Sequence, residues 1–345
     1  MNIISVIGNR PQFIKTVLVS KEIRKTDTEI IVHTGQHYDE NLSDIFFKEL
    51  NIPNPDINLG IAETDQGKQT GLMIMGIEEI LIQEAPDCIV VYGDTNSTLA
   101  GAIAASKLHI PIVHIEAGLR SYNKKMPEEI NRILTDHVST LLFCPNNSAI
   151  QNLKNEGISV GVFNCGDVME EIFFTILKEI DSKKGDPYAY MTLHRSENTD
   201  EKSILNQRIM QVSELNMNVK WPIHPRAKKK IKKFKIKIPS NIEIINPLGY
   251  YDNINHIKNA EFIITDSGGL QKEAYWAGVP CYTLRNETEW GYTVESGWNS
   301  LVPSEGDLKQ IMQDHTIPSK RYLREQNLSQ SQLIVETIKK NIRAS

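Results

Sequence analysis

The chain has 345 residues, of which 40% are hydrophobic and 23% charged, as in globular proteins large enough for two domains. Its net charge of −5 gives none of the bulk basic character typical of proteins that bind nucleic acid. No apolar run is long enough to span a bilayer, and the first residues lack the cationic and apolar regions of a signal peptide. We therefore expect a cytoplasmic protein with neither a nucleic-acid nor a membrane partner.

The cysteines and histidines predict neither disulfides nor a metal. None of the four cysteines forms a C-x-x-C pair, and most lie in or beside apolar runs, so we expect buried, reduced thiols at Cys88, Cys144, Cys165 and Cys281. The nine histidines include no H-E-x-x-H motif and no Cys/His cluster with zinc-ligand spacing. A structural metal is therefore not expected.

Short apolar runs alternate with longer amphipathic stretches along the whole chain. The first half predicts strands at 3–7, 29–33, 88–92, 112–115, 141–144 and 160–164. A charged stretch over 181–186 follows. The second half then predicts strands at 188–192, 219–222, 242–245, 262–265 and 281–284.

These runs are continuous rather than alternating, which is typical of parallel strands covered by helices on both faces. Helical patterns between them indicate βαβ units. We therefore predict an α/β protein of two Rossmann-like, doubly wound domains that face a cleft, with a hinge near residues 181–187. The predicted domains span 1–180 and 187–321, and a C-terminal helix in 322–345 is expected to pack back on the first domain.

Three common motifs are absent. No G-x-G-x-x-G follows a predicted strand, so a tightly bound dinucleotide is not expected. No P-loop and no G-x-S-x-G nucleophile elbow occurs either. The predicted sheets must therefore hold another ligand, and no cofactor is expected.

In an open parallel sheet, ligands bind just beyond the carboxyl ends of the strands. In the first domain this rule selects two cations after the first strand, Arg10 and Lys15. It also selects three acids at neighbouring strand ends or at a helix start, Asp94, Glu116 and Glu128. Acids grouped in one crevice push their pKa values apart, which separates a general acid from a general base.

Each acid also has a purely structural interpretation. Asp94 could cap the helix predicted over 97–107, and Glu128 could complement the dipole of the helix that it opens. Glu116 could pair with Arg120. Three such residues at adjoining positions nevertheless favour a shared catalytic role.

In the second domain, a Ser-Gly-Gly turn between a predicted strand and helix indicates a phosphate cradle at 267–269. Glu273 lies about one turn further along and is placed to accept hydrogen bonds from a ribose diol. An ordinary glycine-rich turn is the structural alternative. His194 follows the first strand of this domain, where we expect it at the cleft rather than in the core, and His224 is a weaker candidate.

The segment from Arg226 to Lys237 holds seven lysines and one arginine. Ile231, Phe234 and Ile238 give it an apolar stripe. We interpret it as the solvated face of an amphipathic helix and loop rather than as a nucleic-acid site.

Six motifs occur in order over nearly the whole chain: G-x-R-P-x-x-I-K, G-D-T-x-[ST], H-x-E-A-G-L-R, P-E-E-x-N-R, H-R-x-E-N and T-D-S-G-G-x-Q-x-E-A. Together they resemble the non-hydrolysing UDP-N-acetylglucosamine 2-epimerases, whose fold is similar to that of two-domain, B-type glycosyltransferases. The resemblance implies a homodimer that interconverts UDP-N-acetylglucosamine and UDP-N-acetylmannosamine. UDP leaves by elimination to a 2-acetamidoglucal and then adds back with C2 inverted.

The resemblance also implies roles for the selected residues. The acid/base carboxylates are Asp94, Glu116 and Glu128. The diphosphate is held by Arg10, Lys15 and His194, of which Lys15 and His194 also count as catalytic because they stabilise the leaving group. The UDP part of the substrate is bound by Ser267, Gly268, Gly269 and Glu273.

Several positions depart from the family pattern. The segment 36–41 lacks the arginine of a Q-H-R-E motif, which puts activation by a second sugar nucleotide in doubt. Trp290 replaces the arginine of a T-E-R-P-E motif, and Lys124 and Lys125 precede the P-E-E segment. The segments R-P-Q-F-I-K, V-H-T-G-Q-H-Y-D-E-N and K-K-M-P-E-E together look more like the branch acting on UDP-2,3-diacetamido-glucuronic acid, whose C6 carboxylate one of the two lysines could meet.

Three other functions share these features. A hydrolysing 2-epimerase would let water capture the sugar and release free N-acetylmannosamine. A glycosyltransferase of the same fold would need an acceptor, and a nucleotide-sugar-binding module would need no acids. The C2 proton is not next to a carbonyl, so elimination of UDP, aided by buried carboxylates and by cations on the diphosphate, is the chemistry that three acids favour.

Overall fold

A computed structural model describes residues 1–36, 54–181, 185–322, 324 and 329–342. The chain divides into two compact units. Unit 1 comprises Met1–Ile172 and Gln326–Ser345, and unit 2 comprises Phe173–Glu325.

Unit 1 is built on a parallel sheet with strand order β3-β2-β1-β4-β5-β6-β7. The order reverses between β1 and β4, which makes that position the topological switch point where ligands bind in such sheets. The strands are β1 (Asn2–Ile7), β2 (Thr28–His33), β3 (Ile57–Asn58), β4 (Cys88–Tyr92), β5 (Ile112–Ile115), β6 (Leu141–Cys144) and β7 (Val162–Asn164).

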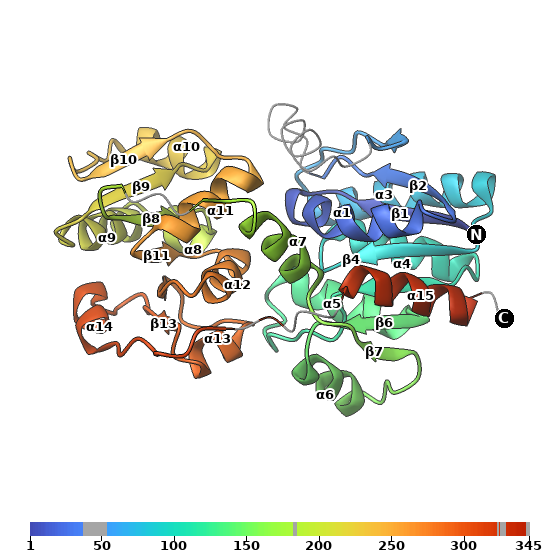
Figure 1. Ribbon diagram of the computed structural model, residues 1–345. Helices are drawn as coiled ribbons and strands as arrows, with labels where there is room; N and C mark the ends of the chain where they lie inside the picture. The colour runs from blue at the N-terminus through green and yellow to red at the C-terminus, as the bar shows by residue number, and fades with distance from the viewer. Residues whose placement is uncertain (37–53, 182–184, 323, 325–328, 343–345) are drawn as a thin grey trace. The chain divides into compact units, whose positions relative to one another are not determined.

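Helices cover both faces of this sheet (Figure 1). On one face α3 packs on α4 and α4 on α5, above a buried cluster that includes Ile4, Val91 and Ile77. On the other face α15 packs on α1. The helices are α1 (Arg10–Ile23), α3 (Gln66–Glu84), α4 (Asn96–Lys107), α5 (Pro127–Val138), α6 (Asn147–Asn155) and α15 (Gln330–Ile342). Helix α7 (Val168–Leu177) begins in unit 1 and ends in unit 2.

Helix α15 is joined to unit 1 by polar contacts at both of its ends. The Glu171 carboxylate accepts hydrogen bonds from the Ser329 hydroxyl and the Ser331 amide, both at 2.8 Å. Near the other end, the Lys339 Nζ lies 3.0 Å from the Asp27 carboxylate. The C-terminal helix is therefore part of unit 1 although it follows unit 2 in the sequence.

Unit 2 repeats the same topology, with strand order β10-β9-β8-β11-β12-β13 and every pair parallel. Its switch point lies between β8 and β11. The strands are β8 (Tyr188–Thr192), β9 (Asn218–Pro222), β10 (Ile242–Ile245), β11 (Phe262–Thr265), β12 (Cys281–Thr283) and β13 (Asn299–Leu301). The helices are α8 (Ser196–Thr199), α9 (Lys202–Ser213), α10 (Pro225–Phe234), α11 (Tyr250–Asn259), α12 (Gly268–Ala277), α13 (Gly291–Glu295) and α14 (Leu308–Asp314).

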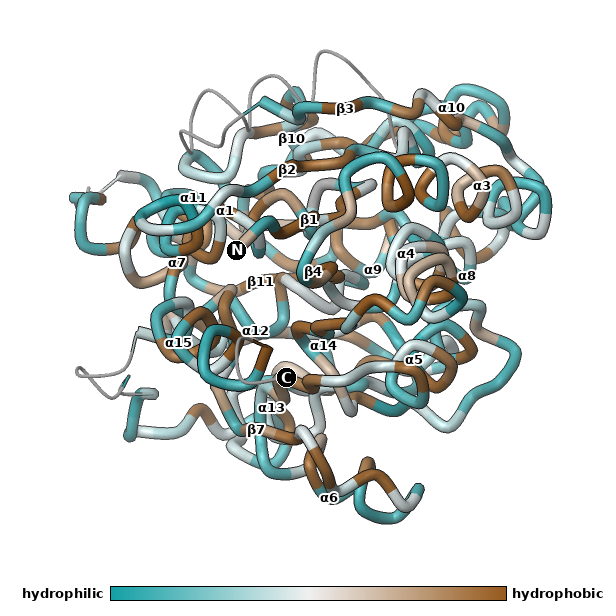
Figure 2. The backbone as a smooth tube through the Cα atoms, turned by 90° about the vertical axis from the view of Figure 1, so that its right-hand side faces the viewer, coloured by the Kyte–Doolittle hydropathy of each residue, from teal (hydrophilic) through white to brown (hydrophobic). Residues whose placement is uncertain are grey.

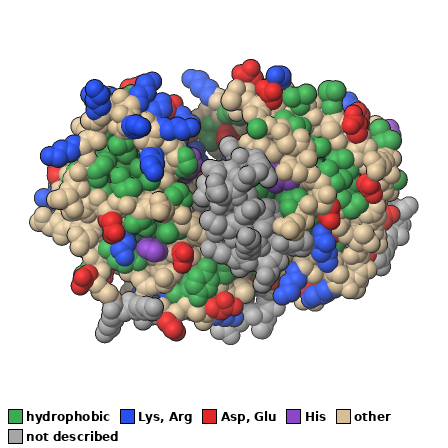
Figure 3. All heavy atoms as spheres, turned by 90° about the horizontal axis from the view of Figure 1, so that it is seen from above, with side chains coloured by type: hydrophobic (Ala, Val, Ile, Leu, Met, Phe, Trp, Pro, Cys, Tyr) green, Lys and Arg blue, Asp and Glu red, His purple; other side chains and the backbone are tan. Residues whose placement is uncertain are grey.

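Helix α10 carries the lysine-rich segment. Ile231, Phe234 and Ile238 pack against the core of unit 2, while most of the lysines are exposed. Figure 3 shows Lys and Arg side chains gathered over this part of unit 2. The amphipathic helix predicted here is therefore confirmed.

The predicted fold class, two Rossmann-like α/β units, is confirmed, and all eleven predicted strands are present. The tube in Figure 2 shows apolar residues concentrated in the strands. Two short strands, β3 and β13, were not predicted because they are two and three residues long. Strand β7 begins two residues later than predicted. Gly161 has a φ of +72°, outside the extended region, and a Cβ there would lie 2.1 Å from the Thr140 carbonyl oxygen.

All four cysteines are buried and free of disulfides, as predicted. Burial raises the pKa of the Cys88, Cys144 and Cys281 thiols to about 12. Within the described residues, no helix combines the length and the apolar character that crossing a bilayer requires.

Candidate active site

The loops that follow β1 and β4 meet at the switch point of unit 1. Gln12, near the start of α1, links them: its Oε1 accepts a hydrogen bond from the Gly8 amide at 2.7 Å, and its Nε2 donates to the Tyr92 carbonyl at 2.8 Å. Asn9 caps α1 by accepting from the Gln12 amide. The first turn of α1 is thereby fixed to the end of β4, and the next turn carries Lys15 to the same edge.

Lys15 and Glu116 form a buried ion pair at this edge. Their Nζ and Oε1 atoms lie 2.7 Å apart, and each side chain is 9% exposed. A Cβ on Gly93 would lie 2.9 Å from the Lys15 Nζ, so the close approach requires glycine there. Glu116 has a φ of +70°, an unfavourable backbone conformation for a glutamate and one that clusters at functional sites.

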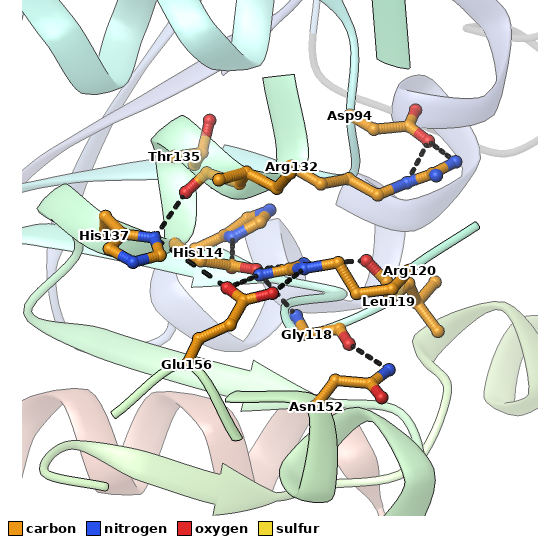
Figure 4. A network of polar contacts seen from close by, with 12 residues as sticks. Asp94, His114, Gly118, Leu119, Arg120, Arg132, Thr135, His137, Asn152 and Glu156 are labelled. Carbon is orange, nitrogen blue, oxygen red and sulfur yellow. Dashed lines mark hydrogen bonds and ion pairs between the residues drawn. The ribbon is translucent and has the colours of Figure 1, made fainter. Parts of the chain in front are cut away.

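Asp94 follows β4, the strand next to the one that precedes Glu116, and pairs with Arg132 of α5. The Arg132 Nη2 and Nε lie 2.6 and 3.0 Å from the same carboxylate oxygen (Figure 4). The Asp94 side chain is 29% exposed, so it stays accessible to a ligand. The alternative that Asp94 caps the following helix is wrong, because Thr95 is the N-cap of α4.

Two glutamates open α5 and differ in their surroundings. Glu128 is exposed in the first turn, where its charge complements the helix dipole. Glu129 is buried and accepts hydrogen bonds from the amides of Ser121 and Tyr122 and from Arg132. Burial raises the pKa of Glu129, but these hydrogen bonds outweigh burial and leave the pKa below its usual value.

A buried network lies beneath these loops (Figure 4). The Asp136 carboxylate contacts the His114 Nδ1 and the Arg120 Nη1, both at 2.7 Å, and Arg120 pairs with both oxygens of Glu156. Burial raises the pKa of Asp136, but His114 and Arg120 lower it to below its usual value overall. The alternative that Glu116 pairs with Arg120 is wrong, since Lys15 is the ion-pair partner of Glu116.

In unit 2, His194 and Asp266 flank the switch point. The His194 Nδ1 lies 3.0 Å from Asp266, whose carboxylate also accepts hydrogen bonds from the amides of His194 and Arg195. Asp266 is fully buried. Burial raises its pKa, but these contacts lower it to below its usual value overall. The His194 side chain is 37% exposed, so it is oriented at the sheet edge and is not a core histidine.

The turn after β11 has the form predicted from its glycines. Ser267 is the N-cap of α12, and its hydroxyl accepts from the Leu270 amide at 3.5 Å. Glu273 is buried on the same helix and accepts from the Asn253 amide at 3.3 Å. Asn253 in turn accepts from the Tyr190 hydroxyl at 2.7 Å. A helix N-terminus with glycines at its first two positions is a suitable anion site.

A second loop lies against this turn. A Cβ on Gly268 would lie 2.5 Å from the Glu289 Oε1, and Glu289 pairs with Arg285 at 2.8 Å. Burial raises the pKa of Glu289, but Arg285 and Arg195 lower it to below its usual value overall. The next residue, Trp290, is buried, and its ring lies 4.0 Å from the Lys272 Nζ, a cation–π distance. Trp290 therefore lies close to the predicted phosphate cradle.

Some predicted positions lie partly or wholly outside the described residues. Arg10 begins α1, but its side chain is not described. Of the segment 36–41, only Gln36 is described, and its side chain accepts from the Ser97 hydroxyl at 2.7 Å.

The interacting residues that were not predicted include Arg132, Asp136 and Asp266. Two of them lie in quoted motifs, P-E-E-x-N-R and T-D-S-G-G, so the motifs were the available signal. Asp136 lies outside the motifs, and no local pattern in the sequence marked it.

Comparison with known proteins was made by sequence and by fold. The family described as "UDP-N-acetylglucosamine 2-epimerase" matches residues 21–331. A UDP-N-acetylglucosamine 2-epimerase homolog of Methanococcus maripaludis is 52% identical over 318 residues, covering 88% of this chain and 89% of that one. A UDP-2,3-diacetamido-2,3-dideoxy-D-glucuronate 2-epimerase of Pseudomonas aeruginosa is 48% identical over 320 residues, covering 89% and 90%.

The solved structures agree with the sequence matches. The UDP-GlcNAc 2-epimerase of Methanocaldococcus jannaschii, crystallised with UDP-GlcNAc and UDP, superposes with a TM-score of 0.92 at 40% identity, covering 99% of this chain and 100% of that one. The enzyme of Neisseria meningitidis bound to UDP-GlcNAc gives a TM-score of 0.87 at 28% identity, with the same coverage.

Proposed function

The chain belongs to the UDP-N-acetylglucosamine 2-epimerase family, and we propose that it inverts C2 of a UDP-linked 2-acetamido sugar, interconverting UDP-N-acetylglucosamine and UDP-N-acetylmannosamine. The observation that carries this proposal is the pair of carboxylates at adjoining strand ends of unit 1. Asp94 is partly exposed beside Arg132, and Glu116 is held by Lys15 at 2.7 Å. Two acids in different surroundings suit a reaction that removes a proton from one face of C2 and returns it to the other.

The proposed reaction proceeds through elimination. One carboxylate takes the C2 proton while the bond between C1 and the UDP oxygen breaks, giving a 2-acetamidoglucal and UDP. UDP then adds back at C1 as a proton reaches the opposite face of C2. Asp94, Glu116 and the exposed Glu128 are the proposed acid/base groups, and Lys15 and Arg10 the proposed cations for the diphosphate.

Unit 2 would bind the UDP portion. The amides at the start of α12, with Ser267, Gly268 and Gly269, suit a phosphate. Glu273, whose carboxylate is fixed by Asn253, suits a ribose diol. His194 is oriented by the buried Asp266, and its partly exposed ring suits contact with a diphosphate.

The test is isotope exchange in deuterated water. The protein is incubated with UDP-N-acetylglucosamine, and C2 is followed by NMR. Deuterium at C2 in intact nucleotide sugar of both configurations is expected. Free N-acetylmannosamine would indicate a hydrolysing enzyme instead. Neither exchange nor UDP release with any 2-acetamido UDP-sugar would refute epimerisation and leave a transferase or a binding module.

A second candidate substrate is UDP-2,3-diacetamido-glucuronic acid. The relative with that activity from Pseudomonas aeruginosa is 48% identical, and Lys124 and Lys125 are both exposed in the loop that leads into α5. A lysine there would meet a C6 carboxylate. The double variant Lys124→Ala/Lys125→Ala should lower kcat/KM for the uronate at least tenfold more than for the neutral sugar. A specificity ratio unchanged by the substitutions would exclude this role.

We also propose a homodimer in the cytoplasm. Helices α3 and α5 expose Met75 at 60%, Ile82 at 65% and Leu134 at 44%, an apolar surface that a second copy would cover. Light scattering should give twice the chain mass, and Met75→Asp/Ile82→Asp should give the monomer. The control is Val160→Asp, a polar substitution at an isolated exposed position of the same unit. Cell fractionation tests the location.

A further inference from the structure

His114 is fully buried near the end of β5 and contacts both the loop after β4 and helix α5. Its Nδ1 lies 2.7 Å from the Asp136 Oδ1, and its Nε2 lies 2.7 Å from the Gly93 carbonyl oxygen. Gly93 directly precedes Asp94. Figure 4 shows the histidine in the network beneath the loop that carries Asp94.

The chemistry of these two contacts fixes the protons on the ring. A backbone carbonyl can only accept a hydrogen bond, so the Nε2 must donate one. The Asp136 carboxylate is ionised, because its other oxygen accepts from the Arg120 guanidinium at 2.7 Å and from the Gly118 amide at 3.1 Å. An ionised carboxylate also only accepts, so the Nδ1 must donate as well.

We infer that His114 is held as a doubly protonated imidazolium and is a positioning residue for both proposed catalytic carboxylates. The Nε2 donates to the carbonyl of Gly93, in the turn after β4 and one residue before Asp94. The Nδ1 donates to Asp136, whose other oxygen accepts from the amide of Gly118, two residues after Glu116. A single cation and a single carboxylate therefore set the separation of Asp94 and Glu116. The catalytic part of this inference rests on the proposed function, whereas the protonation state does not.

The charged and titratable groups around the ring support a fixed cation. Loss of either ring proton would place a nitrogen lone pair against the Gly93 carbonyl or the Asp136 carboxylate, both at 2.7 Å. Asp136 contacts the ring directly, and Arg120 contacts the other oxygen of Asp136. The acids on the neighbouring loops have cations of their own, since Asp94 pairs with Arg132 and Glu116 with Lys15. The charged group in direct contact with the ring is therefore an anion, which favours a retained positive charge on the ring.

The protonation state is tested by NMR on the whole protein labelled with ¹⁵N-histidine. The resonances of His114 are identified by their loss in His114→Gln. Both ring nitrogens should carry a proton at pH 7. A ring with one unprotonated nitrogen at pH 7 would overturn the inference. This measurement needs no activity and no variant of Asp136.

The positioning role is tested by kinetics with the epimerised sugar. His114→Gln and Asp136→Asn should each lower kcat roughly 10- to 100-fold, the effect of misplacing reacting groups by about 1 Å, with KM changed less than about threefold. The control is His137→Gln. This substitution removes a half-exposed histidine from α5, the helix that also carries Asp136, and should leave kcat within about twofold.

The outcomes of the two tests separate the two proposals. An unchanged kcat in His114→Gln would refute the positioning role. An inactive wild-type protein with a doubly protonated His114 would refute the proposed function alone.

Discussion

Gly268 and Gly269 occupy adjacent positions at the start of α12, yet their surroundings differ sharply. A Cβ on Gly268 would lie 2.5 Å from the Glu289 Oε1 and 3.2 Å from the Trp290 Nε1. A Cβ on Gly269 would meet only the Ser267 hydroxyl, at 4.0 Å. Neither glycine has a positive φ, so alanine is compatible with the backbone at both positions. The two alanine variants are therefore a matched pair in which only the crowding differs.

The obstacle at Gly268 cannot move cheaply. The Glu289 side chain is 9% exposed and is paired with Arg285, so displacing its carboxylate disturbs a largely buried ion pair. Overpacking of this kind costs about 1–3 kcal/mol, and the entropic gain of Gly→Ala offsets about 0.4–1 kcal/mol of it. Gly268→Ala should therefore destabilise the protein by about 1–2 kcal/mol, while Gly269→Ala should be neutral or slightly stabilising.

Calorimetry of the two variants measures this difference. About 2 kcal/mol between them corresponds to roughly 4–8 °C in Tm for a unit of this size. Titration with UDP provides a second measurement, because a methyl group at Gly269 would obstruct a phosphate at the helix N-terminus. Gly269→Ala should lose UDP affinity while keeping its Tm. Equal Tm values for the two variants would refute the steric argument.

Three further outcomes follow from the site. Asp94→Asn should lower kcat by ~10²- to 10⁴-fold with little change in UDP affinity, and near-normal turnover would refute its acid/base role. Glu273→Ala should weaken UDP binding more than it lowers kcat, as calorimetric titration and kinetics would reveal. Glu129 has a lowered pKa in the fold, so it stabilises the protein above its unfolded value of 4.5, and this contribution is lost as pH falls through the folded pKa. Urea unfolding should therefore find Glu129→Gln less stable than wild type at pH 7, with the gap closing below pH 4; a constant gap would contradict this.

Much of the fold could be predicted because the strands are apolar on both faces. Runs such as Cys88–Tyr92 and Leu141–Cys144 are buried at every position, so their boundaries in the sequence and in the structure coincide. Strand β3 could not be predicted, since two residues carry no periodicity. The start of β7 follows Gly161, which has a left-handed φ and lies where a Cβ would meet the Thr140 carbonyl. A close approach between residues from different parts of the chain has no local signal.

The candidate site was predictable where a residue's place follows from the strand-end rule. Lys15, Asp94 and Glu116 lie at the switch-point edge because β1, β4 and β5 end there. Their partners were not predictable. Arg120, four residues away, was the alternative partner considered for Glu116, but the structure gives it Lys15, about one hundred residues away. Reasoning from the sequence alone favours partners only a few residues away, whereas a parallel sheet brings loops that are distant in the sequence to the same edge.

The same topology explains why so many ion pairs lie below the proposed catalytic acids. Loops that end parallel strands lack the hairpin bonds that would fix one to the next, so side chains must join them. In unit 1, Gln12 joins the loop after β1 to β4, and His114 with Asp136 joins the loops after β4 and β5. The Gln12 link is neutral, whereas the link through His114 and Asp136 uses charged groups, whose hydrogen bonds are shorter and stronger than neutral ones in a buried site. The residues that orient the acids are therefore as necessary to the proposed reaction as the acids are, although the orienting residues would not contact a ligand.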